Sequence, residues 1–192
     1  VPLSTSLASS TATPSFYKTI VGNVEIVALS DGTNQLPAKF FSNTPDADNT
    51  QTYATAVNTY LVKMADQLIL IDTGNGDRPD QPSLSVKHLE TAGYKPEDIN
   101  VIVLTHFHGD HIGGLLKDGE KRFPKAKVYV PKVEAAHWLS QEKMRVAPEG
   151  ARASFTKAQQ AMAPYHASQQ YVEFEVVEGV DTEILPGVKA IA

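Results

Sequence analysis

Four side chains of the kinds that bind metal ions fall close together in this chain: His106, His108, Asp110 and His111. The two-residue spacing of His106 and His108 puts both on the same side of an extended segment, so they can bind one ion. Gly109 allows a bend toward a helix, which redirects Asp110 and His111 toward a second ion. Imidazole and carboxylate groups suit zinc, the first expectation, and also manganese, cobalt or iron. The spacing therefore predicts half of a site for two divalent metal ions.

Sites with two divalent metal ions commonly catalyse hydrolysis. Water between two divalent ions loses a proton near neutral pH, and the hydroxide attacks an ester, lactone, amide or phosphoryl centre. Asp110 takes a catalytic role in this hypothesis, as acceptor of a hydrogen bond from the attacking hydroxide. The sequence has no cysteine and no Gly-x-Ser-x-Gly segment, which excludes a thiolate and gives no sign of a serine nucleophile. An aspartate before a helix is often only a helix cap, but three neighbouring histidines favour the metal hypothesis.

Buried strands must deliver these residues to one place. Residues 100–104, in which Asn100 precedes four apolar residues, predict a short strand that ends at the cluster, and α/β folds place their sites at such strand ends. Residues 57–62 and 67–72 predict a hairpin around residues 64–66. The segment 113–114, Gly-Gly, indicates close packing of the first helical turn, which also leaves room for a metal.

The rest of the chain alternates between strand and helix patterns. Strands are predicted at 24–29, ending in the turn 30–32, and at 127–130 and 171–177; helices at 84–92, 112–116, 131–139 and 154–162; and a loop at 42–52. This alternation predicts one α/β layered domain.

Composition narrows the classes of function. Of the 192 residues, 42% are hydrophobic, which suits a chain that buries a core. The net charge of -5 argues against a nucleic-acid partner. No apolar run reaches the roughly 18 residues of a membrane span. The polar segment 1–14, which begins with Val1, predicts a flexible leader of an exported protein, periplasmic or secreted; trimming of the expressed protein explains the same start.

The cluster resembles the H-x-H-x-D-H signature of the metallo-β-lactamase fold superfamily. Residues 70–74, Leu-Ile-Asp-Thr-Gly, resemble the strand and Asp-Thr-Gly turn of the same family. The resemblance implies an αββα sandwich, of which this chain covers mainly the N-terminal half within a domain at 15–192. It also implies that Asp72 is a buried residue that orients a metal ligand. The alternative for Asp72 is a simple turn-forming aspartate.

Other segments resemble the methyl parathion hydrolase branch of this superfamily. They are residues 15–17, 24–32, 92–97, 136–140 and 185–188. The branch contains organophosphate hydrolases, lactonases and arylesterases, typically exported homodimers with two metals. The resemblance implies that Trp138 and Phe155 bind substrate, with core packing as the alternative. The loop 75–82 lacks the aromatic residue expected in parathion hydrolases, which leaves lactone and aryl-ester substrates open.

The family's remaining ligands lie in a second half that begins with a Gly-His-Thr-Pro-Gly-His-like segment. His88, His137 and His166 stand in no such segment and are interpreted as ordinary surface or helix residues. The domain is therefore expected to be incomplete at its C-terminus, to bind metal weakly alone, to leave an apolar face open and to need the C-terminal half for activity.

The sequence thus favours a two-metal hydrolase acting on a small-molecule lactone, aryl ester or organophosphate triester. One alternative is a thioester hydrolase of the glyoxalase II kind, against which the branch-like segments count. The other is a non-catalytic binding or assembly module that retains half of the metal site.

Overall fold

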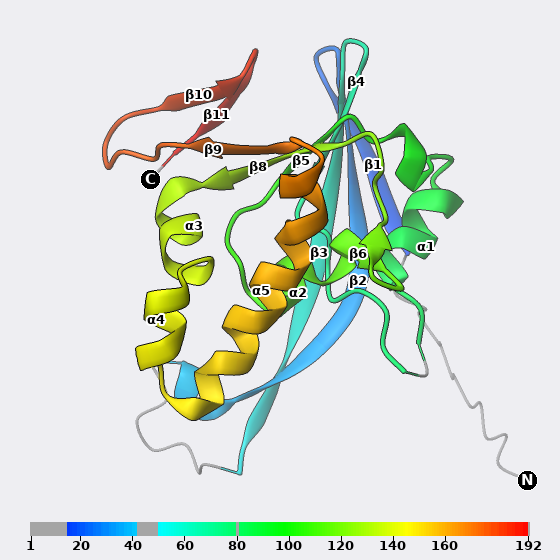
Figure 1. Cartoon of the computed structure of the whole chain (residues 1–192). Coiled ribbons are helices and arrows are strands. Elements are labelled where there is room, and N and C mark those ends of the chain that lie inside the picture. The colour runs from blue at the N-terminus through cyan, green and yellow to red at the C-terminus, as the bar shows by residue number, and fades with distance from the viewer. Residues whose placement is uncertain (1–14, 42–49, 80, 192) are drawn as a thin grey trace, which may run out of the picture.

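The computed structural model describes residues 15–41, 50–79 and 81–191. Within these ranges the centre is a seven-stranded sheet in the order β1-β2-β3-β4-β5-β8-β9 (Figure 1). Its strands are β1 (Phe16–Val21), β2 (Val24–Pro37), β3 (Thr52–Met64), β4 (Gln67–Ile71), β5 (Val101–Val103), β8 (Lys127–Pro131) and β9 (Tyr171–Phe174). Two small antiparallel pairs lie outside this sheet: β6 (Leu116–Lys117) with β7 (Glu120–Lys121), and β10 (Thr182–Leu185) with β11 (Val188–Ala190).

The connections follow from the pairing of the strands. Strands β1 to β4 pair antiparallel, with short turns between β1 and β2 and between β3 and β4, whereas β4, β5, β8 and β9 pair parallel and need crossovers that carry helices. The helices are α1 (Leu84–Thr91), α2 (Gly109–Ile112), α3 (Lys132–Trp138), α4 (Gln141–Val146) and α5 (Glu149–Ala167). Short 3-10 turns occur at Ala38–Phe40, Pro96–Asp98 and Gly113–Leu115.

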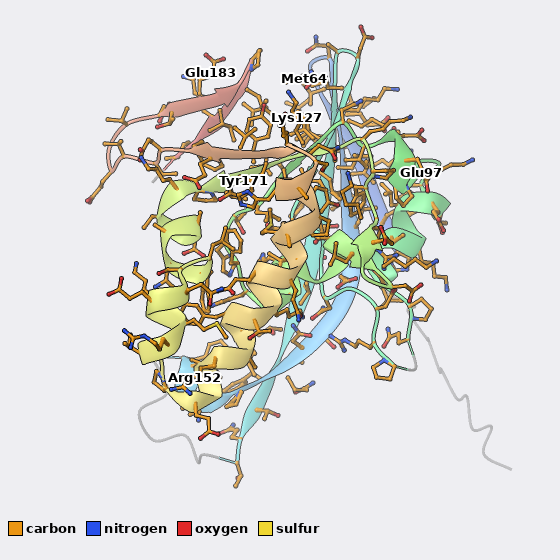
Figure 2. All side chains as sticks on the ribbon, in the orientation of Figure 1. Met64, Glu97, Lys127, Arg152, Tyr171 and Glu183 are labelled. Atoms are coloured by element: carbon orange, nitrogen blue, oxygen red, sulfur yellow. The ribbon has the colours of Figure 1, made fainter. Side chains whose placement is uncertain are left out.

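Apolar residues on both faces of the sheet explain how its layers form. In β5, Ile102 belongs to the main core, while Val101 and Val103 belong to a second cluster on the opposite face, as the two-residue period of a strand requires. The main core packs the sheet against α1, α2 and α5. In Figure 2 side chains fill the space between α5 and the sheet, with Arg152 at the opposite end of the molecule from Met64.

The second apolar face was expected to be open. The structure places the hairpin β10–β11 against it, through Ile184, Leu185 and Val188. Val101 and Val103 are 6% and 7% exposed, so the centre of this face is covered within the described residues. Part of the face is therefore protected by the chain itself.

Several predicted elements are confirmed. The hairpin around residues 64–66 is β3–β4, the run at 100–104 contains β5, and the helix at 84–92 is α1, followed by Gly93 with a φ of 95°. Of the predicted loop at 42–52, residues 42–49 lie outside the described residues, as does the leader 1–14. No helix among the described residues is long and apolar enough to cross a membrane.

Other boundaries were wrong. The helix predicted at 154–162 runs from Glu149 to Ala167, and the strand predicted to reach residue 177 ends at Phe174. Pro131 closes β8 and caps α3 instead of opening the helix. The strands β1, β10 and β11 were not predicted, because edge strands with mixed exposure have a weak apolar alternation.

The turn predicted at residues 30–32 is a bulge inside β2. Pairing with β3 continues on both sides of it, from Ser30 opposite Asn58 to Thr33 opposite Ala56. Gly32 has a φ of 84°, a conformation that glycine adopts without strain. The bulge turns Asp31 inward, where it is 5% exposed.

The helix predicted at 112–116 is replaced by the end of α2 and a 3-10 turn at Gly113–Leu115. Leu116 then enters β6. The main chain of the loop after β4 lies directly against Gly113 and Gly114, immediately after α2 ends.

Candidate metal centre

The predicted ligands lie where β5 ends and α2 begins. Thr105 follows the strand, and His108 is the N-cap residue of α2, so the segment changes from extended to helical backbone within the motif. The ring centroids of His106 and His108 are 4.6 Å apart, and those of His106 and His111 are 3.9 Å apart. Asp110 lies beside them, with its Oδ2 atom 3.7 Å from Nε2 of His111. The structure therefore brings all four predicted ligands together.

Asp72 holds the cluster from the end of β4. It is 6% exposed and has a φ of 58°, in the left-handed region that aspartate tolerates better than most residues. Its Oδ1 atom accepts the Thr105 backbone N–H at 2.8 Å, and Oδ2 accepts the Thr105 hydroxyl at 2.8 Å. Oδ2 also lies 2.8 Å from Nδ1 of His111. Asp72 is thus buried against the motif, and its contact with His111 supports the orienting role predicted for it.

These contacts set the tautomers of two histidines. The carboxylate of Asp72 can only accept, so Nδ1 of His111 donates to it and Nε2 faces the cluster. The Thr105 hydroxyl gives its single proton to Asp72, and it therefore accepts from Nδ1 of His106, 3.0 Å away. Both rings consequently present Nε2 as the atom free to bind a metal.

Electrostatics act differently on the two rings. Burial lowers the pKa of His106, and the neighbouring His111 and His108 lower it further. Burial also disfavours protonation of His111, but its hydrogen bond to Asp72 and the charges of Asp72 and Asp110 outweigh this, so its pKa is raised. A neutral His106 is ready to bind a metal ion, whereas binding at His111 displaces any proton held there.

The donor set fits divalent metal ions. Three imidazoles and one carboxylate are the ligands of zinc and its neighbours, and a carboxylate behind a histidine is the usual support for such a ligand. Among the described residues, no group of three or more His, Asp or Glu side chains is spaced to hold a metal ion. The side-chain types and the orientation of the His106 and His111 rings therefore fit a metal ion, whereas the spacing of the side chains in this structure does not.

A second set of contacts holds the backbone of His111. Its carbonyl accepts the Thr73 backbone N–H at 2.7 Å and the Thr73 hydroxyl at 2.8 Å. A Cβ added to Gly113 would lie 2.1 Å from the Asn75 carbonyl oxygen, and one added to Gly114 would lie 2.1 Å from that of Thr73. Only glycine allows this approach, which confirms the close packing predicted for 113–114.

Asp31 fixes the loop that makes these contacts, a role the sequence did not reveal. Its carboxylate accepts the Asn75 backbone N–H at 2.6 Å, the Asn75 side-chain amide at 2.9 Å and the Ser85 backbone N–H at 2.7 Å. It therefore joins the β2 bulge, the loop after β4 and the first turn of α1. In the sequence, the one sign of this role is that Asp31 precedes Gly32, and the segment 30–32 predicts a turn.

The predicted substrate residues lie on one side of the cluster. The Trp138 ring meets the His108 ring in an edge-to-face contact with centroids 5.8 Å apart, and Phe155 packs against Trp138 at 4.8 Å. Phe155 is only 2% exposed, so it supports Trp138 from within the core. Substrate binding by either residue stays a prediction. Glu134, which the sequence did not single out, accepts hydrogen bonds from Phe107 and Trp138.

The three other histidines lie outside the cluster. Nδ1 of His88 is 2.7 Å from the Ser30 carbonyl oxygen, and His166 stacks on Tyr171 with centroids 3.8 Å apart. His137 packs against Trp138 and Phe155.

Known structures share the fold of this chain. The solved structure of the hydrolase AbOPH, in the beta lactamase superfamily, is similar at 32% identity and a TM-score of 0.75, over 90% of this chain and 64% of that one. The structure of AidC, a dizinc quorum-quenching lactonase, has 24% identity and a TM-score of 0.68 over 86% of this chain and 63% of that one, which shows a shared fold.

Sequence relatives match shorter segments. A probable metallo-hydrolase of Mycobacterium bovis is 36% identical over 93 residues, which cover 39% of this chain and 28% of that protein. The N-acyl homoserine lactonase AiiB of Agrobacterium fabrum is 32% identical over 85 residues, or 34% of this chain and 31% of that protein. The matches thus span under a third of these curated relatives. The family model of the metallo-beta-lactamase superfamily matches residues 52–190, so the chain belongs to that superfamily.

Proposed function

We propose that this chain forms part of a two-metal hydrolase that cleaves lactones, aryl esters or organophosphate triesters. The observation that carries the proposal is the pairing of His111 with the buried carboxylate of Asp72, beside the rings of His106 and His108. A buried carboxylate that fixes an imidazole tautomer is the support that metal ligands commonly receive.

The residues divide the work between two ions. His106 and His108 would hold one ion, and Asp110 and His111 the other, with zinc proposed first for both. When bound, such ions lower the pKa of water and stabilise negative charge that develops on the substrate. Asp110, with a side chain 35% exposed, is accessible to accept a hydrogen bond from the attacking hydroxide.

The substrate class is proposed from the surroundings of His108. The partly buried indole of Trp138, backed by Phe155, gives one side of the site an aromatic wall suited to an aryl leaving group. A lactone substrate is supported by the similarity to AiiB, an N-acyl homoserine lactonase. A glyoxalase II-like thioester hydrolase and a non-catalytic binding module are the competing proposals.

Further parts of the proposal rest on the resemblance to the parathion hydrolase branch. These are a need for the C-terminal half of the fold, assembly as a homodimer, and export to the periplasm or the medium. Light scattering after size exclusion, and fractionation of cells that express the whole gene, test the last two.

The test compares the 192-residue chain with the product of the whole gene. Metal content is measured by mass spectrometry, and turnover is measured with an aryl ester, an N-acyl homoserine lactone, a phosphotriester and a glutathione thioester. We expect two metal ions and turnover of at least one of the first three substrates in the longer protein. Asp110→Asn should lose turnover, whereas His166→Ala, a histidine outside the cluster, should keep it.

Each competing proposal has its own outcome. Turnover of the thioester alone would favour the glyoxalase II-like activity. Bound metal without turnover of any substrate would favour a binding module, and absence of metal from both proteins would refute the metal centre.

A further inference from the structure

One carboxylate oxygen links the metal-binding segment to the aromatic wall. Oε2 of Glu134, in the first turn of α3, accepts the backbone N–H of Phe107 at 3.0 Å. The same oxygen accepts the indole N–H of Trp138 at 3.1 Å, one helical turn further along α3. Hydrogen bonds to a charged acceptor are the stronger kind in proteins, so both donors are firmly held.

The first donor lies at the centre of the motif. Phe107 stands between His106 and His108, and the residue is 1% exposed and belongs to the main core. The core therefore holds its side chain, and Glu134 holds its main chain at the point between the two histidines. Rotation of this peptide would move both rings, since they flank it in an extended segment.

The second donor is the indole N–H of Trp138, a ring packed against its neighbours on several sides. Phe155 packs on Trp138 from the core, and the His108 ring meets it edge-to-face. These apolar contacts allow several orientations of the ring, whereas the bond to Glu134 selects one of them. The orientation of the aromatic wall relative to His108 thus depends on the same carboxylate that holds the motif.

We infer that Glu134 is a positioning residue that determines specificity for substrates with an aromatic leaving group. It does so by holding the Trp138 indole in a fixed position relative to the His106–His108 segment. The inference rests on the proposed hydrolytic function. It assigns no proton transfer to Glu134, whose carboxylate is committed to two N–H donors. Binding of aliphatic substrates, which do not stack on the indole, depends much less on the position of this ring.

A direct test reads the hydrogen bond without activity. Exchange of the Trp138 indole proton with water is followed by NMR in the protein that the gene encodes, with the resonance assigned by its loss in Trp138→Phe. In Glu134→Ala the exchange should accelerate by at least about tenfold, since the donor loses its charged partner. Glu142→Gln removes an exposed charge from the adjacent helix α4 and should leave the rate unchanged. Equal rates in Glu134→Ala and the parent would overturn the inference.

The kinetic test separates positioning from a general structural effect. Glu134→Ala should raise KM for a p-nitrophenyl ester on the order of tenfold, while KM for an aliphatic lactone changes less than about twofold. Glu134→Gln keeps an oxygen acceptor without the charge and should recover part of the loss. Trp138→Phe should raise KM in the parent but add little in the Glu134→Ala background, because the two residues act together.

The remaining outcomes also decide the question. Equal increases of KM for both substrates, or additive effects of the two substitutions, would overturn the specificity role. If no form of the protein hydrolyses any substrate, the proposed function fails on its own. Binding of p-nitrophenol, read from quenching of Trp138 fluorescence, then tests the inference independently: it should weaken in Glu134→Ala, and unchanged binding would refute it.

Discussion

Substitution of Gly113 by alanine tests the close approach between the main chain at Gly113 and that of the loop after β4. Gly113 has φ and ψ of -61° and -31°, so alanine is compatible with its backbone conformation. The obstacle is steric, because the new Cβ would lie 2.1 Å from the carbonyl oxygen and 2.4 Å from the carbonyl carbon of Asn75. Normal contact distances are more than 1 Å longer, and the obstructing atoms are main chain, which cannot rotate away.

The magnitude follows from two opposing effects. Overpacking of this kind costs about 1 to 3 kcal/mol, and alanine regains up to about 1 kcal/mol of helix propensity over glycine. We expect Gly113→Ala to lower the free energy of unfolding by roughly 1 to 2 kcal/mol, or the Tm by about 2 to 8 °C for a chain of this size. Displacement of the 73–76 loop would also disturb the Thr73 bonds to His111 and weaken metal binding about tenfold.

Gly109→Ala is the matched control, at the start of the short helix that Gly113 follows. Its Cβ would meet only the exposed side chain of Lys157, with Nζ at 3.0 Å, and that flexible end can move aside. Its stability should stay within about 0.5 kcal/mol of the parent. Calorimetric melting and urea titration of the three proteins measure the effect. Equal stability of Gly113→Ala and the parent, or an equal loss in Gly109→Ala, would refute the steric argument.

Three further substitutions test the supports of the site. Asp72→Asn should weaken metal binding about 10- to 100-fold, and in the metal-free protein it should lower the pKa of His111, whose increase depends on that carboxylate; metal titration and NMR measure these. Asp31→Ala should destabilise the fold by at least about 2 kcal/mol in urea titration, because three buried or partly buried N–H donors lose a charged acceptor; no loss would show that the loop after β4 is held without Asp31. Partial burial raises the pKa of Asp77, but the Ser83 backbone N–H and Arg122 lower it more, so the net pKa is below the ordinary value. Its contribution to stability is therefore present above the ordinary carboxyl pKa of about 3.9 and disappears as pH falls through the lowered one. Because the Asp77 side chain is 41% exposed, Asp77→Asn should cost only about 0.5 kcal/mol near neutral pH. Urea titration should show this difference shrinking as the pH is lowered below the ordinary carboxyl pKa, and a constant difference would contradict the assignment.

Local patterns predicted the parts of the fold that local forces determine. The apolar run before Thr105 predicted β5, because a strand covered on both faces needs apolar residues throughout. Leu84, Leu89 and Gly93 similarly marked α1 and its end. The proximity of the candidate ligands His106 and His108 was predictable for a related reason, because residues two apart in extended backbone point to the same side.

The supports of the site were harder to predict because their partners are distant in sequence. Asp31 bonds to residues 44 and 54 positions away, and Glu134 bonds to Phe107, 27 positions away. A single buried carboxylate has no periodicity, and its role appears only after the strands have paired. The same holds for the bulge in β2, where the sequence Ser-Asp-Gly is typical of a turn and pairing with β3 overrides it.

The two ends of the candidate metal-binding segment, residues 105–111, are supported by different elements. His111 is held at its ring by Asp72 and at its carbonyl by Thr73, both from the loop after β4. The His108 ring lies between the rings of His106 and Trp138, and its position depends on α3 through Glu134. Hydrogen bonds fix a ring more narrowly than edge-to-face contacts do, so the Asp110–His111 end is preorganised by the sheet. The His108 ring instead takes its position from the Trp138 ring, whose own orientation depends on Glu134. This ring therefore depends on α3, whereas the His106 and His111 rings depend on Asp72, the first through Thr105 and the second directly.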